Sequence, residues 1–600
     1  MTSAEAVTLG LQHHGAGRLS EAEALYRQAL AQDPESLDAL HLLGVVALQR
    51  GEAAEAVELI SRALAGNAAN PPAHNNLGLA LAAQGKQSEA VSAFLAALAL
   101  NPDYADALAN LRAALEHFHH RDGLWVLGET HQRANQLDEA AACMERLLAM
   151  APADANAHNL LANIRRNQAR HREAIEHYEL AIHHDPNPVV AFQNLLFCML
   201  CSGEFSAADI HAKHREFARR FEQPLLPTQP AFGNTRDPER RLKIGYVSPD
   251  FRNNVVGHYM LPILENHDRA RFETHCYFLG ATRDGVSERL MAHADRWHDT
   301  HALPDEALAA LIRSHGIDIL VDLCGHGPGN RILAFARRPA PVQVSYLDYS
   351  ATTGLSSMDY RLTTEYCDPG ATAEQYYSEK LCRLPGAYWT YNPALSLPVS
   401  ALPARANRSV TFGSFNIYYR ITSEVLDLWS RVLLAAPGSR LVIVSVAAGS
   451  TQVAMLERLN RAGISSDRVA VQGLVSYTKY HELMGAVDIA LAPWPYNGAT
   501  TVMDCLWNGL PVVSMAGGET FHTRLGCSVL AAAGLPELIA ADAQDYVRIA
   551  VELVADVSRL AALRPTLRQK LERSPLRDFR GFTKGLESAY RSMWKAWCLR

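Results

Sequence analysis

The chain has 600 residues, of which 48% are hydrophobic and 20% charged, a composition typical of soluble globular proteins. This length needs more than one hydrophobic core, so several domains are expected. A net charge of −7 and a pI of about 6.4 give no electrostatic basis for binding nucleic acid or an anionic membrane. No apolar window is long enough to span a membrane, and the N-terminus lacks a basic stretch followed by an apolar core. We therefore expect a cytoplasmic protein.

The cysteines are scattered and lie mostly in apolar surroundings, which favours reduced thiols over a disulfide framework. Cys198 and Cys201 form the only CxxC pair. They lie in an apolar helical run with no second pair downstream, so a core role is a better interpretation than zinc or redox chemistry.

Small and large apolar residues recur every 34 positions in the first third of the chain. The positions that follow this step are Ala22, Ala56 and Ala90, Gly17, Gly51 and Gly85, and Tyr26, Ile60 and Phe94. This period, with small residues where two helices must approach closely, predicts tetratricopeptide repeats stacked into an α-solenoid superhelix. Its concave groove is expected to hold an extended peptide.

The repeat register breaks at residues 116–123 and resumes with Ala140 and Ala174. The histidines in the break could suggest a metal, but a solvated helix end is the better interpretation. The array is expected to end near Gln223, where Pro224, Pro227 and Pro230 follow. The predicted repeat domain is residues 1–235.

From residue 236 apolar runs alternate with helix-like segments, which predicts parallel sheets covered on both faces. The predicted strands of a first Rossmann-like lobe (236–396) are 242–248, 274–279, 318–323 and 342–347, with a helix at 305–315. A proline-bearing stretch at 397–403 opens a second lobe (397–600). Its predicted strands are 411–415, 441–446, 469–472, 489–492 and 512–515, and an amphipathic helix at 590–597 closes the chain. Two facing doubly wound lobes would share a cleft at the carboxyl ends of their strands.

A small, hydroxyl-rich turn at residues 495–504 follows the predicted strand 489–492 and opens into a helix. Backbone N–H groups and the hydroxyls of Thr500 and Thr501 at a helix N-terminus form a phosphate site. An ordinary helix cap is the alternative interpretation for such a turn taken alone.

Other strand ends add candidates for chemistry. His258 lies near the start of a helix and could act as a general base. The glycine-rich turn 325–331 could approach an anion, and Arg420 could neutralise a diphosphate. A further glycine turn at 511–518 precedes His522 and Arg524. No Asp-x-Asp pair is present to hold a metal–diphosphate complex.

Several of these motifs together resemble the protein O-GlcNAc transferase family. The matching segments are Ser248–Asn253 with Gly257 and His258, Arg338–Gln343, Tyr376–Leu381, Ser414–Asn416, Asn497–Thr501 with Asp504, and Gly517–Thr520 with Arg524. The resemblance covers nearly the whole chain, which looks like a bacterial member because the long insertion between the catalytic lobes of animal members is absent. It implies a GT-B fold, UDP-GlcNAc as donor, and inverting transfer to Ser or Thr hydroxyls of proteins. No cofactor and no metal are implied.

The resemblance also implies roles for individual residues. His258 occupies the place of a histidine once favoured as base, and Arg420 replaces a lysine on the diphosphate. Thr500 and Thr501 would bind the diphosphate, Asp504 the ribose, and Tyr480 would stack on the uracil. The full implied donor-binding set is Asn416, Tyr480, Asn497, Gly498, Thr500, Thr501, Asp504, His326, Gly327 and Leu347.

Two alternatives stay open. The SPINDLY-like branch joins the same two regions and uses GDP-fucose, and Arg420 and Gly327 match neither branch cleanly. A non-catalytic adaptor, in which the repeats bind partners and the nucleotide site has decayed, is the other. Protein or peptide acceptors in the groove are the expected partners, and a homo-oligomer is possible.

Overall fold

The computed structural model describes residues 1–228 and 232–600, so Pro230 lies outside the described residues. The chain divides into two compact units, Met1–Ile164 and Arg165–Arg600. No helix within the described residues is long and apolar enough to cross a membrane.

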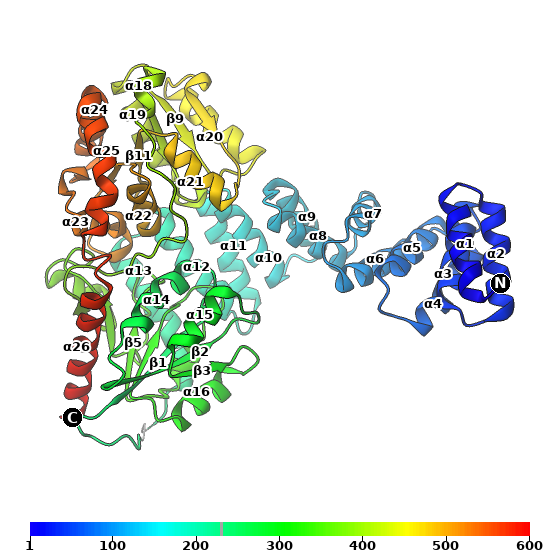
Figure 1. Ribbon diagram of the computed structural model, residues 1–600, viewed down its shortest axis with the longest axis horizontal. Coiled ribbons are helices and arrows are strands. Elements are labelled where there is room, and N and C mark those ends of the chain that lie inside the picture. Colours follow the sequence, from blue (N-terminus) through cyan, green and yellow to red (C-terminus); the bar gives the residue numbers. More distant parts are fainter. Residues whose placement is uncertain (229–231) are drawn as a thin grey trace. The chain divides into compact units, whose positions relative to one another are not determined.

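The first unit consists of antiparallel helix pairs (Figure 1). Its helices are α1 (Ser3–Gly15), α2 (Leu19–Gln32), α3 (Leu37–Gln49), α4 (Ala53–Gly66), α5 (Pro71–Ala83), α6 (Gln87–Leu100), α7 (Ala105–Leu115), α8 (Arg121–Arg133) and α9 (Leu137–Met150). The boundary between the units falls in α10 (Ala155–Asn167). The break in repeat register at 116–123 begins directly after α7, which ends at Leu115, and includes the start of α8, so a helix end lies at the break as expected.

The 34-residue period reflects close helix contacts, but only some of the recurring residues make them. Ala22, Ala56 and Ala90 are fully buried, as expected. Gly17, Gly51 and Gly85 instead lie in the turns between helices with φ of 74°, 83° and 78°, and nothing lies within 4 Å of a Cβ added there.

The close contacts are made by another glycine series with the same period, Gly10, Gly44 and Gly78. A Cβ at these positions would lie 2.5 Å from Tyr26, 2.5 Å from Ile60 and 2.4 Å from Phe94, respectively. The two helices of each repeat can therefore approach only because these positions lack a side chain.

The second unit begins with further helices, which pack against its two α/β lobes. They are α11 (His171–His184), α12 (Val189–Ser202), α13 (Ala207–Phe217) and the π-helical turn η1 (Ala218–Glu222), with η2 (Gln223–Leu225). His171 bonds the backbone oxygen of Tyr419 at 2.7 Å, and Phe197 packs edge-on against Tyr419 and Tyr496. Helices with repeat-like sequence thus form one body with the second lobe.

The first lobe is a parallel sheet with the strand order β3-β2-β1-β4-β5-β6-β7. Its strands are β1 (Leu242–Ser248), β2 (Phe272–Phe278), β3 (Arg296–Asp299), β4 (Ile319–Asp322), β5 (Val342–Ser345), β6 (Tyr360–Thr363) and β7 (Lys380–Arg383). Its helices are α14 (Val255–Asn266), α15 (Gly285–His293), α16 (Asp305–Ser314) and α17 (Ile332–Ala336), with the 3₁₀ turn η3 (Thr372–Tyr376). The predicted strands here are present, and β3, β6 and β7 were not predicted.

The second lobe is a parallel sheet with the order β10-β9-β8-β11-β12-β13. Its strands are β8 (Thr411–Ser414), β9 (Arg440–Ile443), β10 (Val469–Val471), β11 (Ile489–Leu491), β12 (Val512–Met515) and β13 (Ile539–Ala540). Its helices are α18 (Pro403–Asn407), α19 (Ser423–Ala435), α20 (Ser450–Arg461), α21 (Tyr477–Gly485), α22 (Ala499–Trp507), α23 (Leu525–Ala532), α24 (Ala543–Ala555) and α25 (Val557–Glu572). Short 3₁₀ turns are η4 (Tyr418–Arg420), η5 (Ser466–Arg468), η6 (Phe521–Thr523) and η7 (Pro536–Leu538).

The last helix, α26 (Phe579–Cys598), leaves the second lobe and returns to the first, where it runs beside α14 and β5 (Figure 1). Its Trp594 donates to the backbone oxygen of Asp237 at 2.9 Å. The chain therefore crosses between the lobes twice, and the crossings touch: the N–H of Tyr391 donates to the carbonyl oxygen of Leu576 at 2.8 Å.

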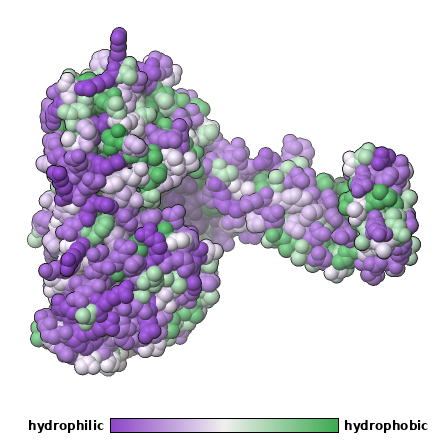
Figure 2. All heavy atoms as spheres, viewed as in Figure 1, coloured by the Kyte–Doolittle hydropathy of each residue, from purple (hydrophilic) through white to green (hydrophobic). Residues whose placement is uncertain are grey.

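The core of the second unit is continuous through both lobes, with large side chains such as Trp429 and Trp594 fully buried. Figure 2 shows hydrophilic residues over most of the visible face of this unit, with hydrophobic residues scattered among them. The fold confirms the prediction of a tetratricopeptide α-solenoid followed by an α/β protein of two Rossmann-like lobes. The predicted domain limits of 1–235, 236–396 and 397–600 stay predictions.

Candidate active site

A hydroxyl-bearing turn connects β11 to α22, as predicted. Gly498 is the residue before the helix, and Thr500 and Thr501 lie in its first turn. A Cβ at Gly498 would lie 2.5 Å from the side-chain oxygen of Asn416 and 3.3 Å from Nη1 of Arg420. Glycine therefore lets a polar and a cationic side chain approach the positive end of the α22 dipole.

A cavity of about 360 Å³ lies at this helix N-terminus, between the two lobes. The first lobe contributes Val255, Val256, Tyr259, Leu347 and Asp348, and the second contributes Asn416, Arg420, Gly498, Thr500 and Thr501. These residues follow β1, β5, β8 and β11 in the chain, so the cavity lies at the carboxyl ends of both parallel sheets. Six of the twelve predicted site residues line it: Leu347, Asn416, Arg420, Gly498, Thr500 and Thr501.

Two buried polar atoms of these lining residues have no protein partner. Among residues 1–228 and 232–600, nothing hydrogen-bonds Oδ1 of Asn416 or Nε of Arg420. The Arg420 guanidinium lies 4.2 Å from the centre of the Tyr496 ring, which holds it in place without using its donors. Buried groups of this kind are normally paired, so these two atoms indicate a polar or anionic ligand.

The two lobes meet at a hydrogen bond within the cavity. The hydroxyl of Tyr259, on α14, lies 2.6 Å from Oγ1 of Thr500, on α22. Val255, Val256 and Tyr259 share one face of α14, which is the face toward the cavity. His258 is displaced from that face and does not line the cavity; its Nε2 bonds Oδ1 of Asn253 at 2.9 Å. Burial lowers the pKa of His258, and the positive charge of Arg289 lowers it further.

A carboxylate that sequence reasoning missed, Asp348, faces the cavity. Its side chain is accessible to solvent, but the protein around it and the nearby Asp250 raise its pKa to about 7. A Cβ at Gly327 would lie 3.3 Å from Oδ2 of Asp348, so the predicted site residue Gly327 makes room for this carboxylate. A carboxyl group that titrates near neutrality in a cleft is suited to proton transfer.

Asp504 and Tyr480 lie beside the cavity but outside its lining. Asp504 accepts a hydrogen bond from the Tyr391 hydroxyl at 2.8 Å, and burial raises its pKa to about 7. Tyr480 donates to the backbone oxygen of Phe415 at 3.1 Å and packs edge-on against its ring, which lines the cavity.

Asn497 and His326 have protein partners and also lie outside the cavity lining. The Asn497 amide bonds the carbonyl oxygen of Thr523 at 3.1 Å and the N–H of Gly526 at 2.7 Å, which ties the turn to α23. His326 is buried against Phe217, and its Nε2 bonds the carbonyl oxygen of Thr353 at 2.8 Å. Burial lowers the pKa of His326 to about 4, so the ring is neutral at pH 7.

Two facing doubly wound lobes, with a polar cavity at the carboxyl ends of their strands, define the GT-B class of protein, and here they follow a helical repeat array. A family model described as glycosyl transferase family 41 matches residues 207–398 and 399–586. Tetratricopeptide repeat models match residues 13–80, 71–104, 98–164 and 157–189. The chain belongs to glycosyl transferase family 41.

Individual relatives agree with this assignment. The chain is 37% identical over 422 residues to a protein of Petunia hybrida named "Probable UDP-N-acetylglucosamine--peptide N-acetylglucosaminyltransferase SPINDLY", over 69% of this chain and 45% of that protein. It is 30% identical over 370 residues to a protein of Arabidopsis thaliana named "Probable UDP-N-acetylglucosamine--peptide N-acetylglucosaminyltransferase SEC". This match covers 60% of this chain and 38% of that protein. The chain thus spans about half the length of the curated relatives it matches. A solved O-GlcNAc transferase mutant of Thermobaculum terrenum has a TM-score of 0.75 at 33% identity, over 89% of this chain and 98% of that one.

Proposed function

We propose that the chain is a glycosyltransferase that moves GlcNAc from UDP-GlcNAc to Ser or Thr hydroxyls of proteins, with inversion and without a metal. The observation that carries the proposal is the pair of unpartnered polar atoms, Oδ1 of Asn416 and Nε of Arg420, beside the N-terminus of α22. Nε of Arg420 and the Thr500 and Thr501 hydroxyls can donate to a diphosphate, and Oδ1 of Asn416 can accept from a hydroxyl of the nucleotide sugar.

In the proposed reaction the acceptor oxygen forms a bond to the anomeric carbon of the sugar. The bond between that carbon and the β-phosphate oxygen breaks, and its electron pair stays on the phosphate. Arg420 and the α22 N-terminus stabilise this growing charge more than they stabilise the bound donor, which lowers the barrier. Because these groups are fixed by the fold, little reorganisation is needed as the charge develops.

The acceptor proton needs a base, and two residues compete for the role. Asp348 faces the cavity and has a pKa of about 7, so a large fraction is ionised at neutral pH. His258, which the sequence predicts as base, lies on the same helix as Tyr259 but does not line the cavity. We assign the role of general base, which accepts the acceptor proton, to Asp348.

A donor titration tests the proposal. UDP-GlcNAc, UDP, GDP-fucose and GDP are added separately to the purified chain, and the melting temperature is followed. UDP-GlcNAc is expected to raise it most, since ligands that bind only the folded state stabilise it. A larger shift with GDP-fucose would mean that the donor is GDP-fucose rather than UDP-GlcNAc. The proposal that the chain is a glycosyltransferase would still stand.

A transfer assay then separates an enzyme from an adaptor. Radiolabelled donor is incubated with the chain and a mixture of Ser- and Thr-containing peptides, and labelled peptide and free sugar are both counted. Transfer or donor hydrolysis above a no-protein control is expected. Absence of both, with either nucleotide sugar, would leave only the interpretation of a binding module.

A further inference from the structure

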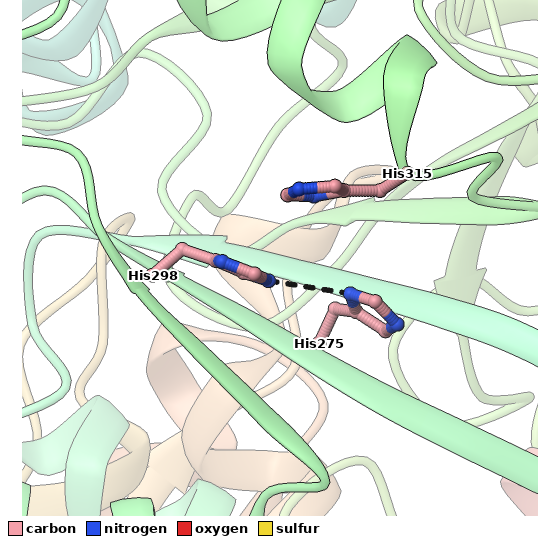
Figure 3. Close-up of side chains that lie close together, drawn as sticks. All are labelled: His275, His298 and His315. Atoms are coloured by element: carbon pink, nitrogen blue, oxygen red, sulfur yellow. Dashed lines mark hydrogen bonds between the residues drawn. The ribbon is translucent and has the colours of Figure 1, made fainter.

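Three histidines gather at the edge of the first sheet, on elements that do not line the active-site cavity. His275 lies on β2, His298 on the edge strand β3, and His315 at the C-terminal end of α16. Nδ1 of His275 lies 3.3 Å from Nε2 of His298, and one ring nitrogen from each of the three lies within 4.8 Å of the others. Figure 3 shows the His275 and His298 rings meeting edge to edge, with the His315 ring lying over them.

The remaining nitrogens of two rings are held by protein groups. Nε2 of His275 lies 3.0 Å from a carboxylate oxygen of Glu273, and Nδ1 of His315 lies 2.8 Å from the Tyr277 hydroxyl. Such outer partners fix the ring orientation and leave the opposite nitrogen with its lone pair. The Glu273 carboxylate can only accept, which leaves Nδ1 of His275 to a ligand, and a Tyr277 hydroxyl that accepts from Nδ1 of His315 leaves Nε2 of that ring.

The surroundings favour neutral rings, which is the form that binds metals. Burial is the first cause that lowers the pKa of each histidine, and neighbouring histidines add to it for His298, whose pKa falls to about 4. Charged groups of both signs surround the cluster. The cations Lys243 and Arg296 lower the pKa of nearby histidines, whereas the carboxylates Glu273 and Asp299 raise it.

Access and chemistry are also suitable. His298 and His315 are half-buried, so an ion can reach the cluster from solvent, while His275 is buried and fixed. The rings of His298 and His315 stack at 4.4 Å, so binding requires the His315 ring to turn edge-on. The nitrogens would draw together to about 3.3 Å, the separation set by metal–nitrogen bonds of about 2.0–2.1 Å in tetrahedral geometry.

We propose that His275, His298 and His315 form a binding site for a divalent transition-metal ion of the Zn²⁺ type, outside the active site. Imidazole ligands suit zinc, copper and nickel, and three of them leave a fourth position for water. The ion would join two neighbouring strands and a helix, and so fasten β3, which is the edge strand beside β2 in this sheet. It has no part in the proposed sugar transfer.

Calorimetric titration of the chelator-treated full chain with ZnCl₂ tests the site. One site with a Kd below about 10 μM is expected, corresponding to about −7 kcal/mol. His298→Gln and His315→Gln should each weaken it at least about tenfold, because Gln keeps polarity but supplies no imidazole nitrogen. His301→Gln, an exposed histidine two residues beyond β3, is the matched control and should bind as the parent chain does.

A second measurement guards against weak binding to other histidines. CoCl₂ replaces ZnCl₂, and visible absorption of tetrahedral cobalt should appear in the parent chain and in His301→Gln but not in the two cluster variants. Circular dichroism verifies that the variants are folded. Identical titrations for all four proteins, or no saturable site in the parent chain, would overturn the proposal. Neither readout uses a sugar donor, so the result is independent of the proposed transferase function.

Discussion

Tyr259 and Thr500 join the two lobes by a hydrogen bond of 2.6 Å, across 241 positions of sequence. Thr500 lies in the first turn of α22, where a donor diphosphate is proposed to bind, so its hydroxyl would serve both the lobe contact and the ligand. If Tyr259 donates to Oγ1, the Thr500 proton is free to point into the cavity. Removal of the Tyr259 hydroxyl is therefore expected to affect donor binding rather than chemistry.

For Tyr259→Phe we expect the KM for the donor to rise about fivefold, the equivalent of one hydrogen bond of about 1 kcal/mol, while kcat changes little. Steady-state kinetics with varied donor measures this. Tyr366→Phe, on an exposed ring whose hydroxyl makes no hydrogen bond to the described residues, is the control. A fall in kcat at unchanged KM would contradict the assignment of Tyr259 to binding.

For Arg420→Ala we expect kcat to fall by about 10²–10³, the loss typical of one preorganised charge-stabilising donor, with a smaller loss of nucleotide affinity. Arg420→Lys should recover part of the activity, because it keeps the charge but loses the planar guanidinium. Exposed Arg405→Ala controls for net charge. Equal losses of turnover and UDP affinity would mean that Arg420 only binds the donor.

The base is identified by a pair of variants and a pH profile. Since the protein around Asp348 and the nearby Asp250 raise the pKa of Asp348 to about 7, its basic form accumulates as pH rises through 7, and kcat should rise over the same range. Asp348→Asn should lower kcat by about 10²–10⁴ and remove this dependence, while His258→Ala should retain kcat within about tenfold. The reverse pattern would restore the sequence-based prediction that His258 is the base.

The helix contacts of the repeat unit make a prediction on stability. A Cβ at Gly44 would lie 2.5 Å from Cγ1 of Ile60, so Gly44→Ala should destabilise the first unit by about 1–3 kcal/mol through overpacking. Gly15→Ala, where nothing lies within 4 Å of the added atom, should be neutral or stabilising. Urea unfolding of the full chain followed by circular dichroism compares them. Equal midpoints would show that the helices of this repeat can separate to accept the methyl group.

Much of the architecture is readable from the sequence because its signals are local. The 34-residue period predicts the repeats, and the apolar runs predict strands such as β1 and β12 with their observed limits. Strands β6 and β7 were not predicted because polar residues interrupt their apolar pattern. In β6, Arg361 is fully buried, and its guanidinium lies 4.8 Å from the centre of the Phe521 ring. That partner is 160 positions away, so the burial of Arg361 has no signal in its neighbourhood.

The site is predictable where it depends on one turn and fails where it depends on orientation. Thr500, Thr501 and Gly498 share the turn before α22 and reach the cavity together. His258 misses it because one helical position turns its side chain away from the face that carries Tyr259. Asp348 could have been found: β5 ends at Ser345, so this carboxylate lies in the loop at the strand end, where ligands of such sheets bind.

The two chain crossings between the lobes, joined at Tyr391 and Leu576, also determine how the molecule can open. Arg577 strengthens this junction by donating to the Tyr391 carbonyl at 3.0 Å. Two chain crossings that are bonded to each other would restrict the lobes to rotation about one axis. The lobes would therefore open by a hinge motion rather than rotate freely relative to each other. Because the Tyr391 hydroxyl also donates to Asp504 on α22, this hinge is attached directly to the helix whose first turn lines the cavity.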